Sequence, residues 1–295
     1  MTGGVVASAI LARRMARFVE IPDPVTRCRG RVRITRRSPA GACSATPLVI
    51  VGGLTQTLAS WGVHARAFAQ SREVVVYETR GQGATELSLD DVSMPRHVED
   101  FSSLLEALAL GATVDLCGLS FGGRVALAVA ATRGDLVRRL VVSAVGRDET
   151  SAGRALVRSW LSTLEAGDLE MFSRQNTMDA FGSAYLEDDG VDLEQLARVA
   201  ANRNRPAAVR ALLRQILSER EPDSPWAPEA LAAKVRCPAL LLGGSLDPIA
   251  PPDEIQALAG PLRAATHIFA GVGHTIPLEA PEEWRRQVLA FLDED

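Results

Sequence analysis

The chain has 295 residues, of which 47% are hydrophobic and 23% charged, and its formal net charge is −4. A chain of this size folds as a globular protein and buries about 75% of the surface that its unfolded form exposes. The 32 lysine and arginine residues are scattered without forming a basic face, which argues against nucleic acid as the principal partner. No segment approaches the roughly 20 uncharged apolar residues that span a bilayer.

The N-terminal region carries an unusual arginine bias. Residues 1–46 hold nine arginines against two acidic residues, a bias that is typical of an organelle import segment. Arginines also alternate with Gly, Val and Ile along residues 29–34, which predicts a strand with one solvated face. We therefore expect residues 16–21 and 29–35 to form the first two strands. Only residues 1–12 are left to act as a targeting signal, and they lack the pattern of a secretory signal. We therefore expect a cytoplasmic protein, with organelle import as the alternative.

The cysteines and histidines show no pattern of a metal or redox centre. Cys28, Cys43, Cys117 and Cys237 lie at spacings that match neither a zinc site nor a CxxC pair. The four histidines form no His-x-x-x-His pair. We therefore expect a reducing compartment, no catalytic metal and no cofactor. These patterns carry no signal for the oligomeric state.

Ser120 lies where the pattern changes from strand to helix. Residues 114–117 are mostly apolar and predict a buried strand, whereas residues 125–131 are a run of strong helix formers. Gly118 and Gly122 flank Ser120 at minus two and plus two, where a tight strand-to-helix turn leaves no room for a Cβ. Such a turn raises the serine hydroxyl above the sheet. Ser120 is therefore the predicted nucleophile.

Two later loops supply candidates for a base and for the acid that orients it. Residues 238–243 predict a buried strand, and the turn-rich loop after it carries Asp247. Residues 264–270 predict the next strand, and a glycine loop carrying His274 follows. Loops at the carboxyl ends of parallel strands meet at one edge of a sheet. The sequence therefore predicts a catalytic triad of Ser120, Asp247 and His274.

Five motifs stand in the order found in the α/β-hydrolase superfamily, which the chain resembles from about residue 17 to its C-terminus. They are the early loop at 49–55, the turn at 77–83, the Gly-Leu-Ser-Phe-Gly-Gly elbow at 118–123, the acid loop at 243–251 and the base loop at 271–283. The resemblance implies an α/β-hydrolase fold, in which a mostly parallel central sheet is flanked by helices and an all-helical cap is inserted. It also implies the triad Ser120, Asp247 and His274, with the backbone N–H groups of Phe121 and Leu54 binding the oxyanion.

Two positions depart from the family pattern. Gly52 and Gly53 stand where relatives usually have His-Gly, and Gln82 stands between two glycines where they usually have histidine. The oxyanion donor is a backbone group, so the hole does not require the histidine side chain. The early loop nevertheless has fewer anchors, and Phe121 is the firmer of the two predicted donors.

Some ninety residues between the sixth strand, at 140–144, and the seventh show helical periodicity. We predict a core of residues 1–146 and 236–295 and a helical cap of residues 147–235. Four cap helices are expected at 153–166, 168–180, 192–202 and 206–220, with Asp168, Asp192 and Pro206 at or near their starts.

The inward face of the cap is expected to roof a mostly apolar pocket. The alternative for each apolar cap residue is that it only packs cap helices together. The candidate wall residues are Trp160, Leu164, Met171, Phe172, Met178 and Phe181.

Several polar residues have two possible roles. Arg124, one helical turn after the nucleophile, suits either a substrate carboxylate or a structural ion pair. Asp148, after the sixth strand, is a weaker alternative to Asp247 as the triad acid. Arg80 is expected to tie down its loop through a buried ion pair. His64 and His97 are expected at the surface or at helix caps, without a catalytic role.

These features predict a serine hydrolase that cleaves a small carboxylic ester, lactone or thioester with an apolar acyl or alcohol group through an acyl-enzyme. The elbow ending in Arg124 is also similar to that of the menaquinone-pathway synthase, a lyase that uses the same triad and needs arginines for substrate carboxylates. A third alternative is a ligand-binding or signalling protein with little turnover. Two or more arginines pointing into the pocket, Arg124 among them, would favour the lyase, whereas an apolar pocket would favour the hydrolase.

Overall fold

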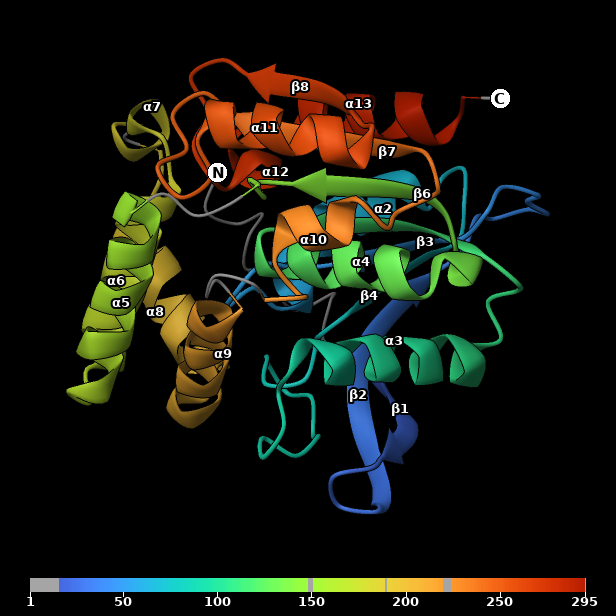
Figure 1. Ribbon diagram of the computed structural model, residues 1–295, viewed down its shortest axis with the longest axis horizontal. Coiled ribbons are helices and arrows are strands. Elements are labelled where there is room, and N and C mark those ends of the chain that lie inside the picture. Colours follow the sequence, from blue (N-terminus) through green and yellow to red (C-terminus); the bar gives the residue numbers. More distant parts are fainter. Residues whose placement is uncertain (1–15, 148–150, 189, 220–223, 295) are drawn as a thin grey trace.

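The computed structural model describes residues 16–147, 151–188, 190–219 and 224–294. At its centre lies an eight-stranded sheet with the strand order β1-β2-β4-β3-β5-β6-β7-β8 (Figure 1). The strands are β1 (Ala16–Asp23), β2 (Cys28–Arg37), β3 (Leu48–Val51), β4 (Val74–Tyr77), β5 (Val114–Leu119), β6 (Val137–Ser143), β7 (Ala239–Gly244) and β8 (Ala265–Phe269). Strand β2 is antiparallel to β1 and β4, and the other neighbours are parallel. The predicted α/β-hydrolase fold is confirmed.

The strand sequences follow from the position of each strand in the sheet. Strands β3, β4, β5 and β7 are buried along their whole length, because helices cover both faces of a parallel sheet. Strand β2 lies near the edge and alternates: Arg29 and Arg31 are exposed, whereas Val32 and Ile34 are buried. The alternation that predicted this strand from its arginines is confirmed.

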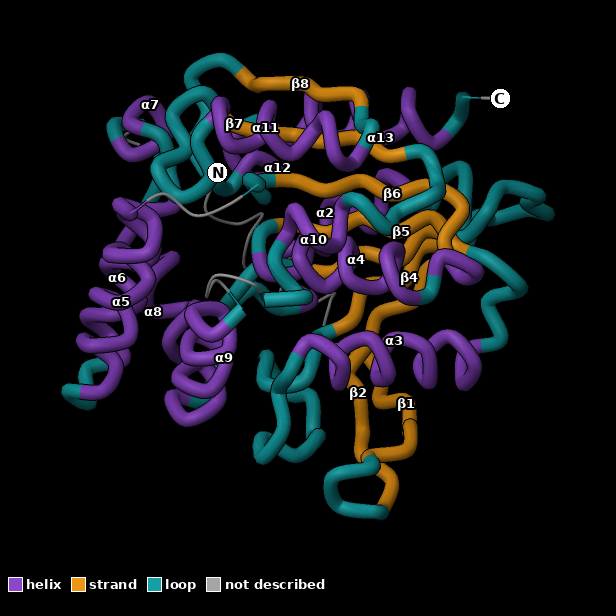
Figure 2. The backbone as a smooth tube through the Cα atoms, viewed as in Figure 1, coloured by secondary structure: helices purple, strands orange, loops and turns teal. Residues whose placement is uncertain are grey.

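Helices pack on both faces of the sheet (Figure 2). One apolar cluster joins the sheet to α3, α4 and α11, which lie in front of it in Figure 1, and a second joins it to α2 and α13 on the other face. The core helices are α2 (Gly62–Phe68), α3 (Met94–Leu108), α4 (Phe121–Thr132), α10 (Pro228–Ala232), α11 (Pro252–Leu262), α12 (Ile276–Glu279) and α13 (Pro281–Leu292), with short 3-10 turns η1 (Leu58–Trp61) and η2 (Gly134–Leu136). No helix in the described part of the chain is both long enough and apolar enough to cross a membrane.

A separate group of helices lies beyond the carboxyl ends of the strands, at the left of Figure 1. Asp168 and Asp192 cap two of them, accepting hydrogen bonds from the N–H groups of Met171 (2.7 Å) and Gln195 (2.8 Å). All four predicted helices are present, together with a short fifth that was not predicted. They are α5 (Ser151–Glu165), α6 (Leu169–Ala180), α7 (Ser183–Leu186), α8 (Leu193–Arg203) and α9 (Pro206–Ser218).

The last helix before β7 belongs to the core by its packing. Helix α10 falls within the predicted cap segment 147–235, yet it packs against α4 and α11 of the core. The chain therefore returns to the core before the seventh strand begins.

Three polar residues of the core bear on the sequence predictions. Arg80 is fully buried and pairs with Asp23 and Asp100, as predicted. His64 and His97 are also buried, so their expected surface position is wrong. The ring of His64 lies 5.0 Å from that of Trp284, and the ring of His97 packs edge-on against that of Phe121 at 5.3 Å. Aromatic packing on apolar helix faces accounts for both positions.

Candidate active site

The turn at Ser120 has the geometry of a nucleophile elbow. Ser120 has φ 51° and ψ −117°, which for a residue with a side chain costs about 1–3 kcal/mol. A Cβ on Gly118 would overlap the backbone of Gly122, and one on Gly122 would overlap the Val51 carbonyl. The Ser120 N–H donates to the carbonyl of Ser143 on the neighbouring strand (2.8 Å), which holds the strained turn in place.

The three predicted triad residues lie in one hydrogen-bonded chain. Ser120 Oγ lies 2.7 Å from His274 Nε2, and His274 Nδ1 lies 2.7 Å from Asp247 Oδ2. The other oxygen of Asp247 accepts from the N–H groups of Ile249 (2.8 Å) and Ala250 (2.9 Å). Asp247 and His274 are both buried. Backbone donors and the imidazole thus compensate the buried carboxylate, which in turn orients the histidine ring.

The histidine loop is held by the cap and by Glu279. The carbonyl of Ala180, at the end of α6, accepts from the N–H groups of His274 (2.9 Å) and Thr275 (3.1 Å). The Glu279 carboxylate accepts from the N–H groups of Gly182 and of the glycine before His274 (2.8 Å each) and from Thr275 (3.0 Å). Burial raises the pKa of Glu279, and these N–H groups oppose that rise. Glu279 lies in the base-loop motif, but no role had been predicted for it.

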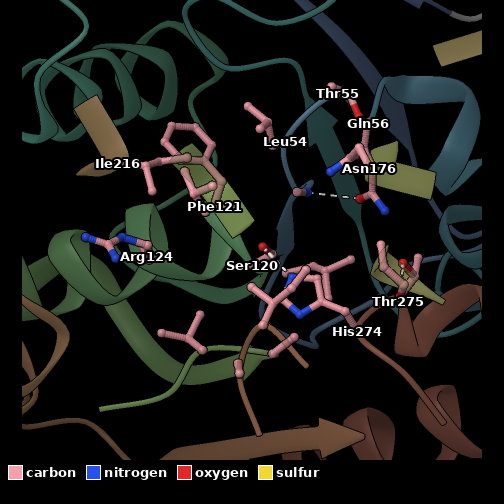
Figure 3. Close-up of a pocket in the computed structure, with 18 of the residues that line it drawn as sticks. Leu54, Thr55, Gln56, Ser120, Phe121, Arg124, Asn176, Ile216, His274 and Thr275 are labelled. Atoms are coloured by element: carbon pink, nitrogen blue, oxygen red, sulfur yellow. Dashed lines mark hydrogen bonds between the residues drawn. The ribbon is translucent and has the colours of Figure 1, made fainter. Parts of the chain in front are cut away.

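Phe121 and Leu54, which carry the two predicted oxyanion donors, both line the cavity with Ser120 (Figure 3). The N–H of Phe121 is the first of α4, where a helix offers no internal acceptor. Leu54 lies in a tight turn after β3, in which the Gln56 N–H donates to the Gly53 carbonyl (3.1 Å). The Gln56 side-chain oxygen also accepts from the Gly53 N–H (2.9 Å). Gln56 therefore anchors the early loop, in which Gly52 stands where relatives usually have histidine.

A buried carboxylate fixes the chain just beyond this turn. Glu78 accepts from the N–H of Leu58 (3.1 Å) and from that of Ala84 (2.8 Å). Burial raises the pKa of Glu78, and these two N–H groups oppose the rise. The carboxylate thus joins the loop after β3 to the loop after β4.

A cavity of about 830 Å³ lies above Ser120 and His274, between the core and the cap. Trp160 and Phe181, two of the predicted wall residues, line it. The indole N–H of Trp160 donates to Asp179 (2.7 Å), and the ring of Phe181 stacks on that of Tyr185 at 4.6 Å. Apolar cap side chains form part of the roof, among them Val157, Trp160, Phe181, Leu196, Val199 and Ile216.

The other predicted wall residues do not line the cavity, and the prediction is corrected for them. Met171, in the first turn of α6, is 44% exposed, and Met178 on the same helix is exposed as well. Phe172 and Leu164 are fully buried in the apolar cluster between helices. Because α6 packs against both α5 and α8, Phe172 serves helix contacts rather than the pocket.

The cavity also has charged lining. Arg124 lines it, but Arg124 Nη2 lies 3.0 Å from a carboxylate oxygen of Glu219, in a buried ion pair. Figure 3 shows its guanidinium directed away from Ser120. Burial raises the pKa of Glu219, and Arg124 opposes that rise. The remaining charged lining residues are Arg147, Arg154, Arg203, Glu229 and Glu254.

Two further predictions concern the alternative triad acid and a metal site. Asp148, the alternative triad acid, lies outside the described residues. Within the described ranges, no three His, Cys, Asp or Glu side chains converge as they would to hold a metal ion.

The sheet, the elbow and the cap define an α/β-hydrolase fold. The sequence matches the alpha/beta hydrolase family over residues 48–287, and the chain belongs to that family. It is accordingly a hydrolase, an enzyme that acts on a small molecule.

Known proteins resemble the chain over most of its length. It is 29% identical over 274 residues to the dihydrolipoyllysine-residue acetyltransferase component of the acetoin cleaving system of Pseudomonas putida, covering 88% of this chain and 67% of that one. It is 26% identical over 251 residues to the pimeloyl-[acyl-carrier protein] methyl ester esterase of Chromobacterium violaceum, covering 80% and 92%. A solved structure of a thermophilic esterase from Thermogutta terrifontis superposes with a TM-score of 0.80 at 20% identity, covering 94% and 98%.

Proposed function

We propose that the enzyme cleaves a small carboxylic ester, lactone or thioester through an acyl-enzyme on Ser120. The observation that carries this proposal is the unbroken chain of two 2.7 Å hydrogen bonds from Ser120 through His274 to Asp247. This chain ends at a strained serine beneath the cavity, beside the first N–H of a helix. Such an arrangement activates a hydroxyl and stabilises the negative oxygen that its attack creates.

The reaction follows from these positions. The Ser120 hydroxyl attacks the substrate carbonyl while His274 Nε2 takes its proton, and the N–H groups of Phe121 and Leu54 bind the oxyanion. His274 then gives the proton to the leaving group, and the acyl–Ser120 ester forms. A water molecule, deprotonated by His274, attacks that ester, and His274 then returns the proton to Ser120 Oγ as the acid is released. Asp247 keeps the proton of His274 on Nδ1 and stabilises the imidazolium.

The substrate class rests on the roof of the cavity. Its apolar cap side chains suit an apolar acyl or alcohol group, because burial of such a group is favourable. One curated relative is a methyl ester esterase, and a protein of the same fold is an esterase, which also supports an ester.

A lyase that binds substrate carboxylates is the second candidate, favoured by the four arginines that line the cavity among the described residues. Against it, Arg124 already has Glu219 as a carboxylate partner, and its guanidinium is directed away from the nucleophile. Comparison of dianionic and neutral substrates of equal size decides between them. A clear preference for the dianionic substrate would favour the lyase.

The hydrolase proposal is tested with p-nitrophenyl esters, lactones and acyl-thioesters of graded chain length. We expect Ser120→Ala to fold normally and to lose about 10⁴-fold or more in kcat. Ser60→Ala is a matched control, because Ser60 lines the same cavity outside the triad and its variant should keep activity within about threefold. Turnover by Ser120→Ala within tenfold of the wild type would reject the assignment.

A fluorophosphonate probe tests the ligand-binding alternative. It should label Ser120 in the wild-type enzyme and leave Ser120→Ala unlabelled, because only an activated serine reacts. Absence of labelling together with absence of turnover would favour a receptor with little catalysis.

A further inference from the structure

Asn204, directly after the last residue of cap helix α8, reaches down to the oxyanion turn. Its side chain is 8% exposed. Asn204 Nδ2 donates to the carbonyl of Thr55 (2.8 Å) and to that of Ala200 (3.0 Å), and Oδ1 accepts from the N–H of Gly83 (3.3 Å). One buried amide therefore joins the cap to the loops after β3 and β4.

The chemistry at this position requires an amide. Two carbonyl oxygens face the nitrogen of Asn204, and one N–H group faces its oxygen. A flipped amide would place its oxygen against the two carbonyl oxygens and its NH₂ against the N–H group. An aspartate of the same shape would place an oxygen against both carbonyls. The residue type is therefore matched to the two loops that it bridges.

The turn that Asn204 contacts needs an external tether. Leu54 and Thr55 are the central residues of the turn from Gly53 to Gln56, and Thr55 has φ 66°. This position of a β-turn is ordinarily glycine, because a side chain there is strained. Gln56 closes one end of the turn and Glu78 holds the chain beyond it. The Thr55 carbonyl, between these anchors, is held by Asn204.

We propose that Asn204 is a positioning residue, which through Thr55 directs the N–H of Leu54 into the oxyanion hole and so couples the placement of the cap to turnover. The inference rests on the proposed hydrolase function. It assigns to the cap a part in the chemical step, beyond roofing the pocket. Asn204 itself acts through the turn and does not line the cavity.

Two variants and one control test the coupling. Asn204→Ala removes the amide, and Asn204→Asp keeps its shape while losing both donors. The control is Arg205→Ala, because Arg205 ties the same junction of α8 and α9 to the core through the Thr85 carbonyl (3.0 Å), away from the oxyanion turn. Thermal melting and circular dichroism establish that each variant folds, and Asn204→Asp preserves the test if Asn204→Ala does not.

The expected result is weaker binding of the transition state, with substrate binding nearly unchanged. We expect kcat to fall about 10- to 100-fold in both Asn204 variants, less than the 10²–10³ that removal of a whole oxyanion donor costs, with KM within about twofold. An alkyl trifluoromethyl ketone, which adds to Ser120 and places an oxyanion in the hole, should bind more weakly by a similar factor. Arg205→Ala should keep kcat and ketone affinity within about threefold.

Three results would overturn the proposal. They are wild-type kcat in a folded Asn204→Asp variant, an equal loss in Arg205→Ala, and a loss that appears in KM while ketone affinity stays unchanged. In each case an active wild type and an inactive Ser120→Ala would leave the hydrolase function intact. If the wild type hydrolysed no ester, lactone or thioester and failed to bind the ketone, the proposed function would fall, and the role of Asn204 with it.

Discussion

The floor and the roof of the cavity are built by different forces. The floor consists of core loops in which Ser120, His274 and Asp247 are fixed by short hydrogen bonds, with Ser120 held in a strained turn. The roof consists of helix faces that meet the cavity in part through apolar side chains such as Trp160 and Val157. Hydrogen bonds are directional, whereas apolar contacts tolerate changes of shape. The floor should therefore determine the reaction, and the roof the choice of substrate.

After the loss of the nucleophile itself, the largest effect should come from the acid in the floor. Asp247→Asn leaves His274 in the wrong tautomer and is expected to lower kcat by about 10³- to 10⁴-fold with little change in KM. Steady-state kinetics on a p-nitrophenyl ester measures this loss. Asp148→Asn is the control and should stay within about twofold. An inactive Asp148 variant with an active Asp247 variant would show that the acid had been assigned to the wrong strand.

Changes in the roof should have smaller effects, of a different kind. Each methylene of an acyl chain that fits the cavity should contribute about 0.8 kcal/mol, or roughly fourfold in kcat/KM. Trp160→Ala should flatten this dependence on chain length, because it removes an apolar wall. Met171→Ala should leave the dependence unchanged, since Met171 is at the surface. Equal responses of the two variants would contradict this view of the roof.

The smallest effect on activity is expected from the buried histidines outside the floor. Burial, reinforced by Arg285, lowers the pKa of His64 to about 4, and burial with Arg80 lowers that of His97 to about 3. In the unfolded chain both imidazoles take up a proton near pH 6.5. Their neutral burial therefore stabilises the fold fully above pH 6.5, and this contribution is lost as the pH falls toward 4.

Denaturant unfolding at a series of pH values measures this loss. Between pH 6 and 4 each histidine should reduce the free energy of unfolding by up to about 1.4 kcal/mol per pH unit. His64→Gln should remove its share of the slope while kcat at pH 7 stays within about twofold. A slope that the substitution leaves unchanged would show that His64 is protonated in the folded protein.

The elements that local rules determine could be predicted from the sequence. Gly118 and Gly122 permit the tight backbone turn at Ser120, where a Cβ would overlap the backbone. The structure brings Ser120, Asp247 and His274 together, as the positions of their loops predict. The starts of cap helices α6 and α8 are predictable for the same reason, because an aspartate at a helix start has a defined hydrogen-bond partner.

Residues whose position depends on packing could not be predicted. Met171 and Phe172 are neighbours on α6, yet one is exposed and the other fully buried. Periodicity gives both residues an apolar role and does not say which face meets the cavity. Asn204 belongs to no motif, and its role depends on two loops that are distant in sequence.

The contacts of the cap with Ala180 and Asn204 have a consequence for evolution and engineering. Caps of this fold invite exchange, since each is a single insertion between two strands. In this enzyme a chimaera that preserved the pocket but altered residues 180–182 or Asn204 would also disturb the histidine loop or the oxyanion turn. The insertion is therefore not an independent module, and new specificity should evolve here by changes within the helices rather than by replacement of the whole cap.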